Sequence, residues 1–413
     1  MAKRRVKRKL KLGNIFLAFS LCVLLGLVFI YLTGGVNLKD NKNIDNVKKK
    51  VPKINKVIEQ KEKVTSASVI AVGDNLIHSS VYKDANRLAN YNGYDFKPMY
   101  ELIKPIVSKY DLAYYNQESI LGGTELGLND YPTFNSPQET GDAMIDAGFN
   151  LVSLATNHTM DSGERAVLAS RKYWDSKKDK VMAVGSYSSS EDRNKIDIRE
   201  VNGIKYTMLN YTYGTNGIPV PNGKDYLVNI WPVTGLNPLN DNKYQEYKKI
   251  VKEDIDRVRD KVDLLMVAMH WGVEYQDMPN KYQEDASEYL NSLGVDIIIG
   301  AHPHVVQPVT WINNTLVIYS LGNFLSAHEV VKMSNRVGLM TSVDIILKDN
   351  KIELSNLNNE LLYTYYTNNY KDFKIIPFSK INSNYLSNYK DVYDKYKKVV
   401  TSLDSNISVI PLG

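Results

Sequence analysis

The sequence predicts an α/β fold, and three observations support this. From residue 66 onward, short apolar runs rich in β-branched residues alternate with amphipathic stretches of helical period. Five of the six histidines stand at or just beyond the ends of such runs, which is where ligands and metals gather in α/β folds. A content of 43% hydrophobic and 23% charged residues is that of an ordinary folded protein.

The first 33 residues predict a membrane anchor. Residues 1–13 carry seven Lys or Arg and no acid, and residues 14–33 are almost wholly apolar. This length just spans a bilayer, and the basic flank is expected to stay in the cytoplasm, against anionic lipids. One N-terminal transmembrane helix would therefore place everything after it outside the cell. A cleaved signal peptide is the alternative, but its apolar core is usually shorter, and residues 31–35 make a poor cleavage site.

The remaining chain divides by composition. Residues 34–65 are polar and rich in Lys and Asn, which predicts an extracellular stalk. Residues 66–357 form the predicted folded domain. Residues 358–413 are a C-terminal extension rich in Tyr, Asn and Lys, with a helix expected near 382–403 and a role that the sequence does not reveal.

The elements of the domain follow from periodicity. Buried or alternating apolar runs predict strands at 68–72, 112–115, 151–154, 181–184, 206–211, 264–269, 297–299, 316–320 and 339–348. Helical spacing of apolar residues predicts helices at 97–109, 136–147, 163–176, 243–261 and 281–293. The strand pairs 181–184 with 206–211 and 316–320 with 339–348 have no helix between them, which predicts a partly antiparallel second sheet.

Charge and cysteine content exclude some function classes. Removing the seven N-terminal basic residues from the total of 51 leaves 44 Lys and Arg against 46 Asp and Glu. The basic isoelectric point therefore belongs to the anchor and does not indicate a nucleic-acid-binding surface. The single cysteine, Cys22, lies inside the predicted span, so the exported part has no disulfide and depends on its core, with a metal as a further source of stability.

Five strand-end blocks carry the candidate chemistry. They are Gly73-Asp74 with His78, Asn116-Gln-Glu118, Asn157-His158-Thr-Met-Asp161-Ser-Gly163, His270-Trp-Gly-Val-Glu274-Tyr275, and Gly300-Ala-His302-Pro-His304. Carboxylates, an amide oxygen and imidazoles are the mixed ligands of Zn, Mn or Fe, not of an all-oxygen Mg or Ca site. A carboxylate that bridges two such ions is the arrangement that activates water against phosphate esters.

Each block has an ordinary structural alternative. Gly73-Asp74 alone is usually a turn, and Glu118 alone is compatible with a solvated loop acid. Asn157-His158 is compatible with a helix cap, and His270-Trp271 with a half-buried aromatic pair. The common placement of all five at strand ends favours one shared metal site.

With the further motif Tyr319-Ser-Leu-Gly-Asn-Phe324, these blocks resemble, in order and content, the CapA/PgsA-type poly-γ-glutamate capsule synthesis proteins. That family belongs to the calcineurin-like metallophosphoesterases. The resemblance covers roughly residues 66–330. It implies a two-sheet sandwich flanked by helices, one or two divalent transition-metal ions (Mn, Zn or Fe), and a domain that lies on the outer side of the cell membrane.

The resemblance also implies residue roles. Asp74 and His304 would hold the first metal, Glu118 would bridge, and Asn157, His270 and His302 would hold the second. His158 would protonate a leaving oxygen, with Asp161 orienting it. The superfamily normally begins Asp-x-His, whereas this chain has Leu76 at the histidine position, so we assign His78 as the substitute ligand. Glu274, Tyr275 and Asn323 are the predicted substrate-binding residues.

Two functions remain open at this point, with a weaker third. The chain is expected to be a membrane-anchored accessory subunit of poly-γ-glutamate synthesis or export, which handles the anionic polymer beside other membrane subunits. ATP-dependent ligation would belong to one of those partners, because this chain has no Gly-x-x-x-x-Gly-Lys-[Ser/Thr] loop. The alternative is a free-standing extracellular hydrolase of phosphoesters or cell-wall amides. The third is a binding module that has lost its metal.

Overall fold

The computed structural model describes residues 64–232, 240–328 and 332–412. The predicted cytoplasmic segment at 1–13, the anchor at 14–33 and nearly all of the predicted stalk at 34–65 lie outside these ranges. Within the described ranges, no helix combines the length and the apolar character that crossing a bilayer requires. Residues 61–413 form one compact unit.

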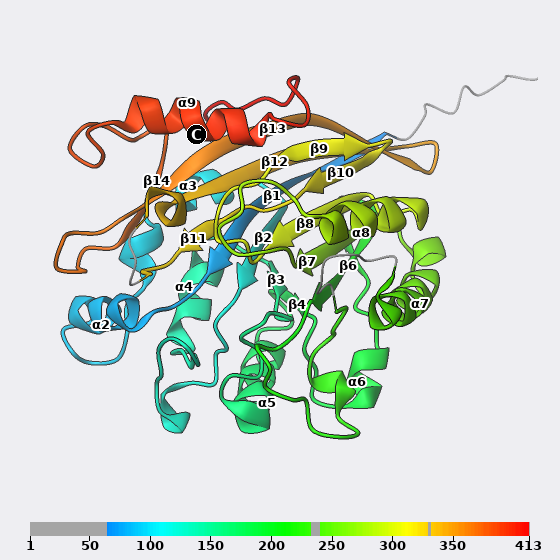
Figure 1. Cartoon of the computed structure of the whole chain (residues 1–413), viewed down its shortest axis with the longest axis horizontal. Coiled ribbons are helices and arrows are strands. Elements are labelled where there is room, and N and C mark those ends of the chain that lie inside the picture. The colour runs from blue at the N-terminus through cyan, green and yellow to red at the C-terminus, as the bar shows by residue number, and fades with distance from the viewer. Residues whose placement is uncertain (1–63, 233–239, 329–331, 413) are drawn as a thin grey trace, which may run out of the picture. The chain divides into compact units, whose positions relative to one another are not determined.

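Two mixed sheets make up the centre of this unit (Figure 1). The first has the order β14-β13-β12-β1-β2-β3-β4, with β11 also paired to β1. Its strands are β1 (Thr65–Asn75), β2 (Leu112–Gln117), β3 (Leu151–Ser153), β4 (Met182–Val184), β11 (Asn323–Leu325), β12 (Val337–Lys348), β13 (Lys351–Tyr365) and β14 (Lys374–Pro377). The second has the order β5-β6-β7-β8-β10-β9. Its strands are β5 (Arg199–Val201), β6 (Ile204–Thr212), β7 (Leu264–His270), β8 (Ile297–Ala301), β9 (Val309–Ile312) and β10 (Thr315–Ile318).

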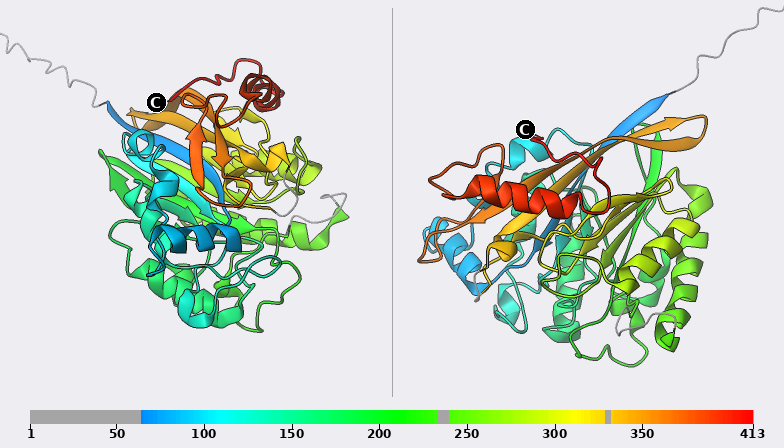
Figure 2. Two further views of the ribbon diagram at one scale, coloured as in Figure 1. Left: turned by 90° about the vertical axis from the view of Figure 1, so that its left-hand side faces the viewer. Right: turned by 45° about the horizontal axis from the view of Figure 1, so that its top comes forward.

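The sheets pack face to face, and helices cover their outer faces (Figure 2). Because side chains alternate along a strand, Val69 and Ala71 of β1 face the second sheet, while Ile70 and Val72 face the helices. The helices are α2 (Ser79–Leu88), α3 (Lys104–Val107), α4 (Glu139–Asp146), α5 (Gly163–Asp175), α6 (Ser190–Asn194), α7 (Asn242–Asp256), α8 (Lys281–Ser292) and α9 (Tyr389–Val400). The predicted α/β class with two sheets flanked by helices is thus the observed architecture.

The parallel strands at the centre of each sheet determine where the candidate site lies. Strands β1, β2, β3 and β4 run parallel in the first sheet, as do β6, β7, β8 and β10 in the second. The carboxyl ends of β1, β2, β7 and β8 therefore release their loops toward one common region.

Several elements differ from the sequence prediction. The predicted helix at 97–109 is divided into a 3-10 turn, Lys97–Tyr100, and the short helix α3, because Pro98 and Pro105 each remove an N–H donor and restrict the preceding residue. The predicted helix near 382–403 begins only at Tyr389. Periodicity predicts no element at the positions of α2, α6, β5, β9, β11, β13 and β14.

The two strand pairs predicted to have no helix between them also differ from the prediction, because α6 and β5 lie between β4 and β6, and β11 lies between β10 and β12. In each pair one strand belongs to the first sheet and the other to the second, so the connection passes between the sheets. Antiparallel pairing instead lies along one half of the first sheet, at β1-β12-β13-β14, and at both edges of the second, at β5-β6 and β9-β10.

The C-terminal segment is part of the first sheet. Residues 357 and 358, where the domain was predicted to end and the extension to begin, are neighbours inside β13. The following α9 packs its buried Val392, Tyr396 and Val400 into the core between the sheets. The Asn, Ser and Glu residues of β13 conceal the strand in the sequence, because its first half is only partly buried and the apolar alternation there is weak.

Candidate metal centre

Six ligand-type side chains from five strand ends meet in the buried interior of the two-sheet unit. Two overlapping groups form, and in each group the ligand atoms lie within 4.8 Å of one another. One group is Asp74, Glu118 and His304, and the other is Glu118, His270 and His302. Because Glu118 belongs to both, the arrangement is that of a pair of sites with a bridging carboxylate.

Distances inside the first group are short. Oδ2 of Asp74 lies 3.3 Å from Nδ1 of His304, and Oε1 of Glu118 lies 3.6 Å from Nε2 of the same ring. In the second group, Nε2 of His270 lies 3.4 Å from Oε1 of Glu118 and 2.8 Å from Oδ1 of Asn157. Asn157, another of the predicted ligands, therefore stands beside the second group with its amide oxygen toward His270.

The loop after β8 holds its two histidines in a strained backbone. His302 has φ of 95° and His304 has φ of 58°, in the left-handed region that side-chain-bearing residues seldom occupy. Such conformations cost about 1–3 kcal/mol each and persist where the surrounding structure enforces them. Close packing at Gly300 supplies this constraint at the start of the loop, because a Cβ at this position would lie 1.9 Å from the carbonyl oxygen of Tyr319.

The buried polar atoms fit a divalent cation. Both carboxyl oxygens of Glu118 and Nδ1 of His302 are buried and have no hydrogen-bond partner among the described residues. Burial raises the pKa of Glu118 well above its usual range, because a negative charge that has neither water nor a hydrogen-bond partner is unfavourable there. A cation between the two groups would remove that cost, and an O/N ligand set suits Zn, Mn or Fe.

The histidines differ in protonation. Burial lowers the pKa of His270 and of His302 well below the usual value, which keeps each ring neutral with a lone pair for a metal. Burial opposes a charge on His304 as well, but Glu118 and Asp74 outweigh it and raise the pKa of His304 to about 10. In the absence of metal, the proton on His304 thus lies beside the side chains of Asp74 and Glu118.

A second layer of hydrogen bonds orients these ligands. Ser153 donates to Oδ1 of Asn116 at 2.7 Å, and the Asn116 amide donates to Asp74 at 2.9 Å and lies 3.3 Å from Nδ1 of His270. Asn323 places its Oδ1 3.0 Å from Nδ1 of His304. Asn116 and Asn323 therefore act on ligand orientation, a role that the substrate-binding assignment of Asn323 did not include.

His158 and Asp161 form a separate pair beside the metal groups. Nδ1 of His158 lies 2.6 Å from Oδ2 of Asp161, and that oxygen also accepts from the backbone N–H of Phe134 at 2.7 Å. Asn216 lies 3.4 Å from the same Nδ1 and bonds Asn157 through its Oδ1. The carboxylate of Asp161 thus orients the ring through Nδ1 and leaves Nε2 on the other side of the ring. The role in proton transfer that the resemblance implies stays a prediction.

His78 is not brought into either metal group. Its Nδ1 accepts the backbone N–H of Ala327 at 3.1 Å, and its ring packs edge-on against Phe134 at 5.2 Å. Its other ring neighbour is His328, at 5.0 Å. The sequence reasoning did not select His328, because it follows β11, a strand of three residues that apolar periodicity does not reveal.

A cavity of about 290 Å³ adjoins the centre, and its lining joins His158 and His304 to His78, Phe134 and His328. Glu274 and Tyr275, two predicted substrate-binding residues, also line it, together with Lys332. Glu274 additionally forms a third ligand-type group with His302 and His304. The predicted substrate residues on the loop after β7 therefore face the space through which a ligand would reach the metal groups.

Comparison with known proteins places these residues in a family. The family model for the bacterial capsule synthesis protein PGA_cap matches residues 68–328. The PGA biosynthesis protein CapA of Bacillus subtilis is 29% identical over 188 residues, which cover 46% of this chain and 45% of that protein. The capsule biosynthesis protein CapA of Bacillus anthracis is 31% identical over 193 residues, 46% of this chain and 43% of that protein. The matched segment thus spans less than half the length of either relative.

The similarity of this chain to solved structures is weak. A phosphatase from Mycoplasma pneumoniae has a TM-score of 0.43 and 16% identity, covering 80% of this chain and all of that one. A 5′-nucleotidase, so described, from Staphylococcus aureus has a TM-score of 0.44 and 13% identity, covering 80% of this chain and 58% of that one. At these TM-scores neither structure bears on what this chain does.

Proposed function

Because this chain belongs to the PGA_cap family of bacterial capsule synthesis proteins, we propose that it is a membrane-anchored extracellular accessory subunit of poly-γ-glutamate synthesis or export. The observation that carries the proposal is the position of the family match. Residues 68–328 include every residue of both metal groups and the His158–Asp161 pair. The basic segment and apolar run of residues 1–33 supply the anchor in this proposal.

The proposed metal centre uses Asp74, Glu118, His270, His302 and His304. A divalent ion bound there would act as a Lewis acid toward an oxygen of the substrate or of water. The chain itself contributes orientation through Asn116 and Asn323, and Nε2 of His158 as a positioned nitrogen for proton transfer. The strain at His302 and His304 is consistent with a centre whose ligand positions are built before metal arrives.

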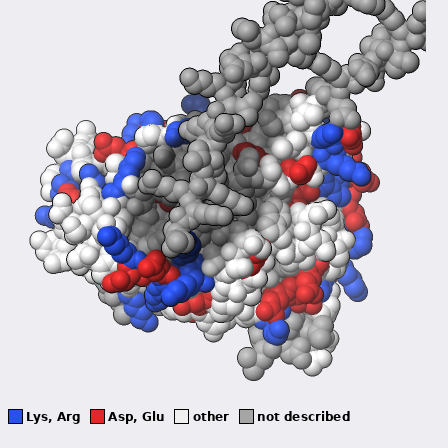
Figure 3. All heavy atoms as spheres, turned by 90° about the horizontal axis from the view of Figure 1, so that it is seen from above, with Lys and Arg blue, Asp and Glu red and all other residues white. Residues whose placement is uncertain are grey.

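The adjoining cavity is the proposed contact for the emerging polymer. Net charge does not attract polyglutamate, because the chain beyond its basic N-terminus is slightly acidic. On the face shown in Figure 3, acidic and basic side chains are likewise mixed. Carboxylates of the polymer would therefore need a local cation, and Lys332, whose ammonium lies 5.5 Å from the Tyr275 ring centre, stands at the cavity beside the metal groups.

Capsule production in the bacterium that encodes the chain tests this proposal. Deletion of the gene should abolish cell-bound poly-γ-glutamate, and the full chain should restore it. His302→Ala and Asp74→Ala should fail to restore it at equal protein level in the membrane fraction. Normal capsule in the deletion strain would reject the role, as would the full chain in a fraction other than the membrane.

The alternative, a free-standing extracellular hydrolase of phosphoesters or cell-wall amides, is favoured by one observation. A histidine fixed by a buried carboxylate beside two metal groups is what protonation of a leaving group requires. Metal content and phosphodiester hydrolysis measured on the same purified full chain decide between the two. Metal-dependent turnover without any partner would establish the hydrolase, and metal without turnover would favour the accessory subunit. A chain that holds no metal would be a binding module.

A further inference from the structure

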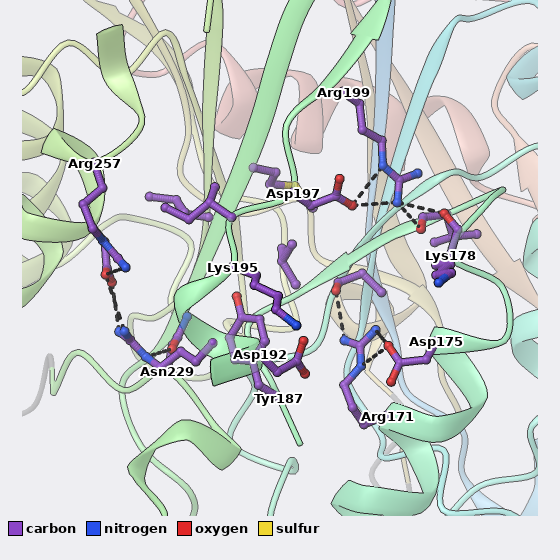
Figure 4. A pocket seen from close by; sticks show the side chains of 18 residues that line it. Arg171, Asp175, Lys178, Tyr187, Asp192, Lys195, Asp197, Arg199, Asn229 and Arg257 are labelled. Carbon is purple, nitrogen blue, oxygen red and sulfur yellow. Dashed lines mark hydrogen bonds and ion pairs between the residues drawn. The ribbon is translucent and has the colours of Figure 1, made fainter. Parts of the chain in front are cut away.

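A second cavity lies away from the metal centre, at the sheet edges where β4 of the first sheet meets β5 and β6 of the second. Helices α5, α6 and α7 also contribute to its lining, and its volume is about 190 Å³ (Figure 4). It shares no lining residue with the metal groups or with the cavity beside them. Its charged lining consists of the cations Arg171, Lys178, Arg193, Lys195, Arg199 and Arg257 and the carboxylates Asp175, Asp192, Asp197 and Asp254.

Three of the arginines are held in place by the protein itself. Arg171 donates to the carbonyl oxygens of Ala183 and Ser186 at 3.0 and 3.2 Å. Arg193 donates from Nε to the side chain of Asn229 at 2.9 Å. Arg199 donates to the carbonyl oxygens of Lys178 and Val181 at 2.9 and 2.8 Å. Guanidinium groups fixed in this way lose little freedom when an anion binds, which favours binding.

The charges around this cavity do not cancel. Six cations face four carboxylates, so two positive charges remain in excess. The buried Asp254 is shared by the guanidiniums of Arg193 and Arg257, so one carboxylate serves two cations there. Among the described residues, the ammonium groups of Lys178 and Lys195 form no hydrogen bond or close ion pair, although Lys195 interacts electrostatically with Glu191. Lys195 extends into the middle of the cavity in Figure 4.

We propose that this cavity binds a compact oxyanion with two or more negative charges, of the phosphate or dicarboxylate class. Such a ligand would balance the two excess charges, and its oxygens match the donors of lysine and arginine. If the ion pairs only braced the sheet edges, carboxylates would be expected to match the lining cations in number. The proposal concerns a site separate from the metal centre and does not depend on the capsule function.

Binding of inorganic phosphate to the chelator-treated full chain tests the proposal. Titration calorimetry at constant ionic strength is the measurement, with chloride as the monovalent comparison. Lys178→Gln with Lys195→Gln should weaken phosphate binding about tenfold, because each exposed ammonium contributes only a few-fold. These side chains are exposed and leave no buried partner behind, so the variant should fold, which circular dichroism verifies. The matched control is Lys243→Gln with Lys249→Gln, two exposed lysines of α7 outside the cavity, which should bind phosphate as the unaltered chain does.

A variant of the metal centre separates the two sites. His302→Ala should keep phosphate binding unchanged, because His302 does not line this cavity. Repeating the titration with glutarate distinguishes a phosphate ligand from a dicarboxylate, and tighter binding of either supports the proposal. The proposal is overturned if neither anion binds, if the double lysine variant binds as tightly as the control, or if His302→Ala abolishes binding.

Discussion

Glu118 stands between the two ligand groups with both oxygens buried and unpartnered among the described residues. The negative charge of Glu118 should therefore contribute more to metal binding than that of any other side chain of the centre. Glu118→Gln keeps the shape and removes the charge, so it should lower metal affinity at least about a hundredfold, more than the loss of an outer-shell partner costs. Elemental analysis after dialysis against a metal buffer measures this.

Glu118→Asp is the control for that change. It retains the carboxylate at a bridging position and should retain most of the metal, with a shift of less than about tenfold. Equal metal content in the Gln and unaltered chains would show that Glu118 is not a ligand.

Asn323 offers a second test at the residue scale, because it would affect metal binding only by orienting the His304 ring. Its Oδ1 lies 3.0 Å from Nδ1 of His304, and its amide donates to the backbone carbonyl of Asn335 at 2.9 Å. Asn323→Ala should free the His304 ring and weaken metal binding about 10- to 100-fold. Asn359→Ala, which removes a buried amide in β13, should lower stability while leaving metal affinity intact. Equal losses of affinity in both variants would mean that the effect is only loss of structure.

At the scale of elements, the close approach of β1 and β11 positions Asp74. A Cβ on Gly73 would lie 1.8 Å from the carbonyl oxygen of Gly322, and the N–H of Asp74 donates to that same oxygen at 2.9 Å. Gly73→Ala must push the strands apart and should cost about 3 kcal/mol or more of unfolding free energy. Gly214→Ala, at a position with open space around it, should cost less than about 1 kcal/mol. Urea unfolding of both variants tests this, and similar costs would contradict it.

The strand β13 shows where element prediction fails. Its partly buried first half is rich in Asn, Ser and Glu, so the period-2 pattern is weak, and only its pairing with β12 and β14 makes it a strand. In contrast, β2, β7 and β8 are buried along their whole length, and β7 and β8 read as nearly continuous apolar runs in the sequence.

At the scale of the whole molecule, residues 358–413 should be required for folding. Leu361, Tyr363, Ile376 and Tyr396 of this segment are buried in the core between the sheets. A chain ending at residue 357 would expose that core and should be insoluble or lack a cooperative unfolding transition. Tyr396→Ala in the full chain should cost about 3–5 kcal/mol but still fold. A soluble, cooperatively unfolding truncated chain would contradict this expectation.

The buried histidines give the metal-free protein a pH dependence of defined sign. Burial lowers the pKa of His78 to about 4, whereas the unfolded chain titrates near 6.5. Between these values the unfolded chain binds a proton that the folded chain does not, so stability falls as pH falls from about 6.5 toward 4. His270 and His302 act in the same direction, each by up to about 1.4 kcal/mol per pH unit.

His304 acts with the opposite sign. Its pKa of about 10 exceeds the unfolded value, so its stabilising contribution is complete below about 6.5 and is lost as pH rises toward 10. Denaturant unfolding of the metal-free chain across the acid range measures the net slope. His78→Asn keeps an acceptor for the N–H of Ala327. It should lower the number of protons taken up on unfolding, to which the slope is proportional, by about one. An unchanged slope would mean that His78 is protonated in the folded protein.

The sequence by itself determined the α/β class, the main parallel strands and the set of polar residues at their ends, because these depend on local periodicity and on which residue follows an apolar run. It also carried the family resemblance that the match over residues 68–328 confirmed. The tertiary structure decided which of those residues meet. Asp74, Glu118, His270, His302 and His304 converge because parallel strands from two facing sheets end in one region, whereas His78 packs on Phe134 and His328 instead. Side-chain convergence depends on strand order and on backbone angles such as those at His302 and His304, and neither is encoded in any short stretch of sequence.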